Sequence, residues 1–335
     1  MNLGVVVGGD LRDIASLARD AEDAGFESVW VAETARSAFV QAAVVAQATS
    51  RVLVGTDIAL AFPRSPAITA MAARDLAELS GGRFVLGLGS QVKRVNEHRF
   101  GVAFEHPAPK LGETVEAVRA VLRAFAGEPL DFRGRFYELT MPPFPGAGGA
   151  PGGRIPIYVA AVNPVMAETA GGVADGVLGH PMTSPRYVVE VMRPCIERGA
   201  KAGGRDPDEV NVTTGVILSI SDDPEEARRE AALQIAFYAT TRTYRPVLQL
   251  HGLDGLVDPL REAFGRGDAA RMVDLAMPAV DSLAIAGTAA ECRERIEAFE
   301  GVADRVILGG VWIGPSPERV AANHRAILKT FGAAG

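Results

Sequence analysis

The sequence predicts a (β/α)8 barrel, also called a TIM barrel, and three observations favour this fold class. Apolar segments of strand length alternate with segments of helical periodicity along most of the 335 residues. Eight such strands are found, each followed by a helix, whereas an open doubly wound sheet rarely has eight regularly alternating units. The strand that begins at Val52 is apolar at successive positions, which is typical of a parallel strand covered on both faces.

The first four strands lie within residues 1–89. The predicted strands are 3–7, 28–32, 52–60 and 84–89, and the predicted helices between them are 11–24, 39–48 and 66–79. Pro66 is suited to opening the third helix, because its missing N–H belongs to a first turn that leaves such groups unpaired. Gly81 and Gly82 end that helix, and Gly87 and Gly89 allow another part of the molecule to approach the fourth strand closely.

Residues 109–331 continue the alternation. A helix at 109–125 precedes a small hairpin at 130–139 that turns at Arg133 and Gly134, and residues 142–154, rich in Pro and Gly, form a loop. The remaining strands are 155–160, 176–178, 210–220 and 305–308, and the helices are 164–170, 186–202 and 317–331. Residues 222–304 form a helical insertion between strands seven and eight. No Gly-, Ser- and Pro-rich linker brackets this insertion, so we expect a single domain over residues 1–335.

Composition excludes several classes of function. The net charge of −7 argues against nucleic acid as a partner, and no apolar run reaches the ~18 residues of a transmembrane helix. The first strand begins without the basic segment of a signal peptide. Cys195 and Cys292 lie far apart inside helical patterns, which favours buried free thiols over a disulfide. We therefore expect a cytoplasmic protein that acts on a small-molecule substrate, away from membranes and nucleic acids.

Polar residues at the carboxyl ends of the strands are the candidate site residues, because TIM-barrel enzymes carry their active sites there. Glu33 and Asp57 follow neighbouring strands, and either is suited to orienting a ring or moving a proton, although solvated loop acids show the same pattern. His180 follows strand six as a general acid, a ring contact or a structural residue. His98 and His106 lack metal-ligand spacing with any Cys or acid, so we expect no metal.

An anion site is predicted after strand five. Asn163 and Pro164 are a typical helix start, and the free N–H groups and dipole of such a start attract a phosphate, to which Ser90 is placed to donate as well. An ordinary cap without a ligand is the alternative. Basic residues after strand four either pair with an anionic tail or form a solvated loop; they are Lys93, Arg94 and Arg99. Tyr238 and Tyr244 are interpreted as packing residues of an insertion that is able to cover a pocket.

Five segments of the sequence match motifs of a known family and occur in the order expected for it. They are AEDAGFESVWVAE from Ala21, VGTDIA from Val54, SPAITAMAARDLAELSGGRFVLGLGSQ from Ser65, IPIYVAAVNPVMAETAG from Ile155 and ADGVLGHP from Ala174. Together they resemble the bacterial-luciferase-like superfamily of flavin- and deazaflavin-dependent oxidoreductases, with SGGRFVLGLG a rather specific motif. Residues 183–199 and 235–252 also resemble a coenzyme F420-dependent subfamily, so the resemblance covers nearly the whole chain.

The resemblance implies a luciferase-like TIM barrel with an isoalloxazine-type ring in the barrel mouth. It implies a cis peptide bond at Asp57–Ile58 beneath the ring and makes Glu33 the candidate catalytic residue. The positions that match cofactor contacts of the family, or lie beside them, are Asp57, Ile58, Ser90, Gln91, Ala161, Val162, Asn163, Val165, Met166 and His180.

Two departures from the family pattern bear on the substrate. Glu33 and Thr34 stand where the sugar-phosphate dehydrogenases of the family have an Asp-His pair, and Val92 stands where they have an acid. A sugar-6-phosphate substrate is therefore not expected. The methylenetetrahydromethanopterin reductases also have an acid in the loop of Val92, which argues against that activity.

The activity that follows is hydride transfer between coenzyme F420 and a small organic substrate, with the protein orienting the reactants and excluding water. The insertion and the loop after strand four would form a lid. One alternative is an FMN-dependent monooxygenase that uses O2 and a partner flavin reductase; another is a catalytically silent flavin-binding protein. Lys93 and Arg94 favour F420, whose tail carries carboxylates. A homodimer is expected through the helices at 39–48 and 67–79, which are rich in Ala.

Overall fold

The computed structural model describes residues 1–142 and 153–332, and within them eight parallel strands close into a barrel. The closure is complete because each strand pairs with the next and β12 pairs with β1. The barrel strands are β1 (Asn2–Val6), β2 (Ser28–Val31), β3 (Leu53–Thr56), β5 (Phe84–Gly89), β8 (Ile157–Ala161), β9 (Gly176–Gly179), β10 (Asn211–Ile220) and β12 (Arg305–Gly310). The predicted fold class is confirmed.

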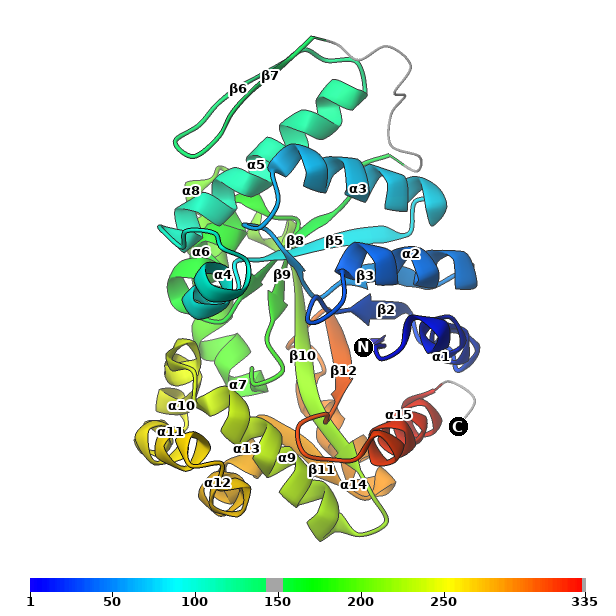
Figure 1. The fold of residues 1–335 in the computed structure, drawn as a ribbon, viewed down its shortest axis with the longest axis vertical. Coiled ribbons are helices and arrows are strands. Elements are labelled where there is room, and N and C mark those ends of the chain that lie inside the picture. The colour runs from blue at the N-terminus through cyan, green and yellow to red at the C-terminus, as the bar shows by residue number, and fades with distance from the viewer. Residues whose placement is uncertain (143–152, 333–335) are drawn as a thin grey trace.

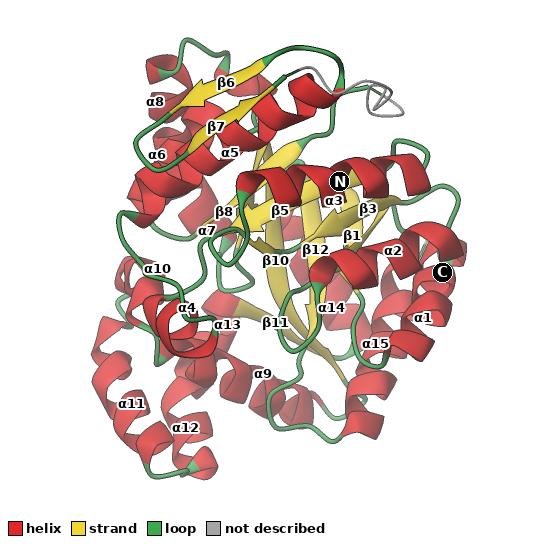
Figure 2. Cartoon of the chain, turned by 45° about the horizontal axis from the view of Figure 1, so that its top comes forward, coloured by secondary structure: helices red, strands yellow, loops and turns green. Residues whose placement is uncertain are grey.

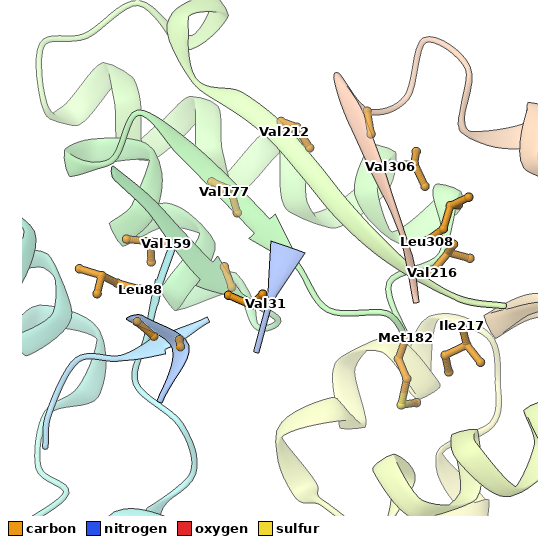
Figure 3. Packing of buried hydrophobic residues seen from close by; sticks show 14 of the residues in the cluster. Val31, Leu88, Val159, Val177, Met182, Val212, Val216, Ile217, Val306 and Leu308 are labelled. Atoms are coloured by element: carbon orange, nitrogen blue, oxygen red, sulfur yellow. The ribbon is translucent and has the colours of Figure 1, made fainter. Parts of the chain in front are cut away.

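Helices surround the strands, as Figure 1 shows. Before β10 they are α1 (Leu11–Asp23), α2 (Ala38–Ala48), α3 (Pro66–Leu79), α4 (Lys93–Arg99), α5 (Pro107–Phe125), α6 (Pro164–Val173), α7 (Pro185–Tyr187) and α8 (Arg193–Ala202). A π-helical segment, Val188–Met192, joins α7 to α8. The last helix is α15 (Pro317–Phe331). Valine and leucine side chains on successive strands fill the layer beneath the helices (Figure 3).

The barrel interior is filled by a separate cluster of large side chains. Trp30, Val85, Tyr158, Leu178 and Ile307 are buried there, and the Trp30 and Tyr158 rings lie 6.4 Å apart between centroids. Glycines on neighbouring strands make room for the two rings: a Cβ at position 55 would lie 2.2 Å from the indole of Trp30, and one at position 176 would lie 2.7 Å from the ring of Tyr158. The interior is therefore a packed core rather than a pore.

The insertion between β10 and β12 is helical but also contains a strand that the sequence reading missed. Its helices are α9 (Pro224–Ala239), α10 (Arg245–Leu250), α11 (Val257–Gly265), α12 (Ala269–Ala276), α13 (Val280–Leu283) and α14 (Ala289–Ile296). The strand β11 (Ala284–Gly287) pairs with the carboxyl half of β10, beyond the point where β9 ends. This pairing is available because β10 is longer than the other barrel strands. Figure 2 shows α10, α11 and α12 grouped at one corner of the molecule.

Several element boundaries differ from the predictions. The single strand predicted at 52–60 is broken after Thr56, and its second part, β4 (Ala59–Leu60), pairs with β5. Residues 93–99, interpreted as a loop, form α4. The predicted hairpin is present as β6 (Leu130–Arg133) and β7 (Glu138–Met141), but its turn spans residues 134–137, where Glu113 of α5 accepts three backbone N–H groups. Most of the predicted loop at 142–154 lies outside the described residues.

A buried carboxylate and a half-buried guanidinium tie the outer helices to the start of β3. The carboxylate of Glu22, at the end of α1, accepts the backbone N–H groups of Ser50, Arg51 and Val52 at 2.6–3.0 Å. Arg83, the last residue of the SGGR turn, donates to backbone carbonyls of α2, α3 and the Val52 segment. These contacts satisfy carbonyls and N–H groups that the helix ends and the strand start leave unpaired.

Cys195 and Cys292 are both buried and free, as predicted. Among residues 1–142 and 153–332, no helix has the length and apolar character needed to cross a membrane. In the same part of the chain, no three His, Cys, Asp or Glu side chains are grouped as metal ligands.

Candidate active site at the barrel mouth

Half-buried residues gather at the carboxyl ends of the barrel strands. Val6, Ile58 and Ala160 pack against the interior cluster from above and remain partly exposed, so they form an apolar floor. Polar residues that are equally half-buried follow the same strand ends; they are Asp57, Ser90, Gln91, Asn163 and His180. TIM-barrel enzymes carry their active sites at this end of the barrel. Here it has an apolar floor with polar groups around it.

The floor is built around the Asp57–Ile58 peptide, which is cis, as the resemblance implied. The Asp57 N–H donates to the Val31 carbonyl, and the Ile58 carbonyl accepts from the Glu33 N–H, which fixes the segment to the end of β2. Gly89 leaves the space that Ile58 occupies, because a Cβ there would lie 1.9 Å from Ile58 Cδ1. The close approach predicted for the glycines of the fourth strand is therefore filled by Ile58.

Glu33 is buried beside this segment and is fully engaged. Its Oε2 accepts the Leu60 N–H at 2.8 Å and Arg64 Nη1 at 2.7 Å, and its Oε1 pairs with Arg64 Nη2. Arg64 also donates to the Leu60 carbonyl. Both oxygens of the carboxylate are thus committed to protein groups, an arrangement that positions residues 57–64. We therefore propose a positioning role for Glu33 in place of proton transfer.

Glu33→Gln is expected to lower the free energy of unfolding by about 2 kcal/mol, because it leaves the partly buried Arg64 guanidinium without its counter-charge. The double variant Glu33→Gln with Arg64→Met is expected to recover part of that loss. Chemical denaturation of the two variants checks this. Turnover should fall in Glu33→Gln more than cofactor affinity does; unchanged turnover would remove Glu33 from the site altogether.

Asp57 is the carboxylic acid of the site that remains unpaired. No described residue donates a hydrogen bond to its side chain or forms an ion pair with it. Burial raises the pKa of Asp57 from 3.8 to about 7. Burial raises the pKa of Tyr238 of α9, and the negative charge of Asp57 adds to that rise. An acid that exchanges its proton near neutral pH is suited to general acid–base catalysis.

The insertion reaches the barrel mouth through two tyrosines. Tyr244 Oη lies 3.0 Å from His180 Nε2, and the ring of Tyr238 packs edge-on against His180 at 4.5 Å between centroids. Burial lowers the pKa of His180 to about 3, so the imidazole is neutral at physiological pH. The sequence predicts packing roles for both tyrosines, and the structure adds their contacts with His180. The signal that was available is their position in a segment able to cover the pocket.

The predicted anion site rests on one backbone amide. Asn163 caps α6 by accepting the Met166 N–H, its carbonyl accepts the Ala167 N–H, and Pro164 has none. This leaves the Val165 N–H without an acceptor among the described residues. Ser90 and Gln91 follow β5, the strand that pairs with β8. The Ser90 carbonyl accepts from the Asn96 side chain, and Gln91 adopts a left-handed conformation with φ of 56°.

The remaining residues predicted to contact the cofactor differ in how deeply their side chains are buried. Val162 is half-buried, and its carbonyl accepts from Tyr187 Oη at 2.7 Å. Ala161 and Met166 have side chains buried in the outer core, so these side chains are not available to a ligand in the barrel mouth. The basic residues after β5 lie on α4: Lys93 pairs with Glu97, and Arg99 donates to the Thr34 carbonyl. Arg94 is exposed and has no partner among the described side chains.

Comparison with known proteins places this geometry in a family. The family model described as luciferase-like monooxygenase matches residues 3–305. An uncharacterised protein of Mycobacterium tuberculosis is 38% identical over 311 residues, 89% of either chain. A 5,10-methylenetetrahydromethanopterin reductase of Methanolobus tindarius is 33% identical over 91% of this chain and 92% of its own.

A solved structure agrees with the sequence relatives. The coenzyme F420-dependent tetrahydromethanopterin reductase of Methanopyrus kandleri superposes with a TM-score of 0.82 at 27% identity, over 99% of this chain and 97% of its own. The match covers the barrel and the insertion together. The chain therefore belongs to the luciferase-like family of oxidoreductases.

Proposed function

We propose that this protein is a coenzyme F420-dependent oxidoreductase that transfers hydride between the deazaflavin and a small organic substrate. The observation that carries the proposal is the apolar floor around the cis Asp57–Ile58 peptide, together with the unpaired Asp57 carboxyl and the Val165 N–H that no described residue accepts. The similarity to a reductase that uses coenzyme F420 supports the choice of cofactor.

The residues at the mouth fit a planar ring with a phosphate-bearing tail. Ile58, Val6 and Ala160 offer an apolar surface for the ring, and the Val165 N–H is a donor for the phosphate. The Ser90 hydroxyl donates to the Gln91 carbonyl at 3.2 Å in this structure and would turn from it to reach the phosphate. Arg94 on the exposed face of α4 adds a positive charge for the carboxylates of a deazaflavin tail. Bound there, coenzyme F420 supplies the hydride chemistry, and the protein supplies orientation, exclusion of water and a proton from Asp57.

The test of the cofactor is a fluorescence titration of the purified protein with oxidised and reduced coenzyme F420 and, separately, with FMN. Micromolar binding of F420 with FMN at least about tenfold weaker (about 1.4 kcal/mol) supports the proposal. Preference for FMN would favour a monooxygenase that uses O2 and a partner flavin reductase. Binding of neither would favour a catalytically silent protein.

Asn163→Asp is expected to weaken F420 binding by about tenfold or more. Aspartate caps helices as well as asparagine does, so α6 keeps its start while a negative charge is added beside the predicted phosphate position. Asn163→Ser, a neutral cap, is the control and should bind nearly as wild type. Titrations at two salt concentrations check the origin of the effect, because added salt screens the repulsion. Equal affinity in all three proteins would place the phosphate elsewhere.

The homodimer expected from the resemblance stays a proposal. Val40 of α2 and Ile68 and Met71 of α3 are about half exposed, and the two helices pack side by side. We propose this face for a second copy of the chain. Light scattering of the purified protein tests it, and a monomer at micromolar concentration would contradict it.

A further inference from the structure

The hydrogen bonds of His180 determine which of its nitrogens carries the proton. The backbone N–H of Met182 lies 3.2 Å from His180 Nδ1 and is only able to donate, so Nδ1 accepts. The ring is neutral, because burial lowers its pKa to about 3. A neutral imidazole with an accepting Nδ1 carries its proton on Nε2.

This tautomer fixes the role of the Tyr244 hydroxyl. With its proton on Nε2, His180 donates to Tyr244 Oη across 3.0 Å. The hydroxyl hydrogen of Tyr244 is then left uncommitted, and no described residue accepts it. Burial also raises the pKa of Tyr244, so that the hydrogen is retained. A half-buried donor without an acceptor is unfavourable unless a ligand or water supplies one.

The segment that carries Tyr244 is anchored to the end of β9 at several points. Ser184 Oγ and His251 Nε2 lie 2.8 Å apart, and Arg186 donates to the Leu250 carbonyl at 3.2 Å. Together with the His180 contact, these bonds hold α10 over the loop that follows β9. The Tyr244 hydroxyl is therefore fixed relative to the barrel strands rather than free to move with the insertion.

We propose that Tyr244 is a catalytic residue whose hydroxyl donates a hydrogen bond to the carbonyl oxygen or imine nitrogen of the substrate. This assignment rests on the proposed function and narrows it to substrates in which the carbon that accepts hydride is doubly bonded to such an atom. His180 is the positioning residue, because it turns the Tyr244 hydrogen away from itself. Tyr238, edge-on to His180, adds an aromatic wall that suits a small, weakly polar substrate.

The step balances in electrons and protons for a carbonyl substrate. A hydride from reduced coenzyme F420 forms the new C–H bond, and the π electrons of the C=O bond move to oxygen. Tyr244 stabilises the negative charge that develops on that oxygen, in the way that oxyanion donors do. Asp57 gives the oxygen a proton and regains one from solvent, and reduced F420 would release its ring N–H proton to solvent, so that no net proton is consumed. The substrate is reduced to an alcohol, and the cofactor is released in its oxidised form.

A first test needs no substrate. In 15N NMR spectra of the full-length protein near neutral pH, His180 should show an unprotonated Nδ1 and a protonated Nε2, with its signals assigned by their loss in His180→Gln. The Nε2 signal should shift in Tyr244→Phe and stay in place in Tyr137→Phe, a change of the same kind at the distant hairpin. A protonated Nδ1 would overturn the inference, because Tyr244 would then donate to Nε2 and have no hydrogen left for a substrate.

A second test measures oxidation of reduced F420 by small ketones, aldehydes and cyclic imines. Tyr244→Phe should bind F420 as wild type does and lower kcat/KM by about 10- to 100-fold, while Tyr137→Phe changes neither. His180→Gln, which keeps a donor toward Tyr244, should retain more activity than His180→Leu. An unchanged kcat/KM in Tyr244→Phe would overturn the assignment. Wild-type protein that binds F420 but reduces none of these compounds would refute the substrate class alone, and absence of F420 binding would refute the proposed function itself.

Discussion

Replacing Asp57 with Asn is expected to lower turnover by about 100-fold or more while leaving F420 affinity within a few-fold of wild type. The amide has the same shape but does not give up a proton, and general acid–base catalysis contributes about 10²–10⁴ in rate. Asp57 is the site acid without a partner among the described residues, whereas both oxygens of Glu33 are occupied. Steady-state kinetics and fluorescence titration on the same preparations separate the two effects.

The pH dependence of the wild-type protein follows from the same residue. Burial raises the pKa of Asp57 to about 7, so the carboxyl is protonated below that value. Reduction of the substrate needs the proton of Asp57, so its rate should fall as the pH rises through about 7. This fall in the pH–rate profile should be absent in Asp57→Asn. If the rate falls with the same midpoint pH in wild type and in Asp57→Asn, another group donates the proton.

Asp57→Asn should also make the protein more stable at alkaline pH. The folded-state pKa lies above the value of 3.8 for an unperturbed Asp, so the folded protein binds more protons than the unfolded chain between these values. Stability is therefore lost as the pH rises from about 4 to 7, on the order of 4 kcal/mol in total. Chemical denaturation across this range should show the loss in wild type and in the exposed control Asp258→Asn, and not in Asp57→Asn.

Glu22→Gln is expected to destabilise the protein by about 2 kcal/mol at neutral pH. Burial acts to raise the pKa of Glu22, but hydrogen bonds from Val52, Arg51 and Ser50 outweigh it and lower the pKa from 4.5 to about 2. The charged form is thus favoured in the folded state. An amide oxygen still accepts these N–H groups but without the strength that the charge adds.

The sign of the pH effect at Glu22 is opposite to that at Asp57. A depressed folded-state pKa gives stability that is present above about pH 4.5 and is lost as the pH falls toward 2, about 3 kcal/mol in total. Denaturant midpoints should therefore differ between wild type and Glu22→Gln at pH 7 and converge in acid. Asp23→Asn, next in sequence but largely exposed, is the control and should follow wild type. A constant difference at all pH values would mean that the charge is not responsible.

Much of the fold was readable from local patterns. The alternation of apolar strands and periodic helices predicted all eight barrel strands, and Asn163 followed by Pro164 predicted the cap of α6. The sequence did not predict the short elements, because these have no periodic pattern of their own. The strand β11 has four residues and is defined by its pairing with β10, and α4 has seven residues with one buried side chain, Asn96.

The candidate site divides in the same way. The sequence by itself determined the fold, the strand ends on which site residues stand and, through its resemblance to the family, the position of the cis peptide. Only the tertiary structure decided that Glu33 is paired with Arg64, that Asp57 is left unpaired and that His180 meets Tyr244. Each of these contacts joins residues 31 or more positions apart or depends on the absence of a partner. Periodicity reports whether a side chain is buried, but the proton that it carries is set by the particular groups the fold brings against it.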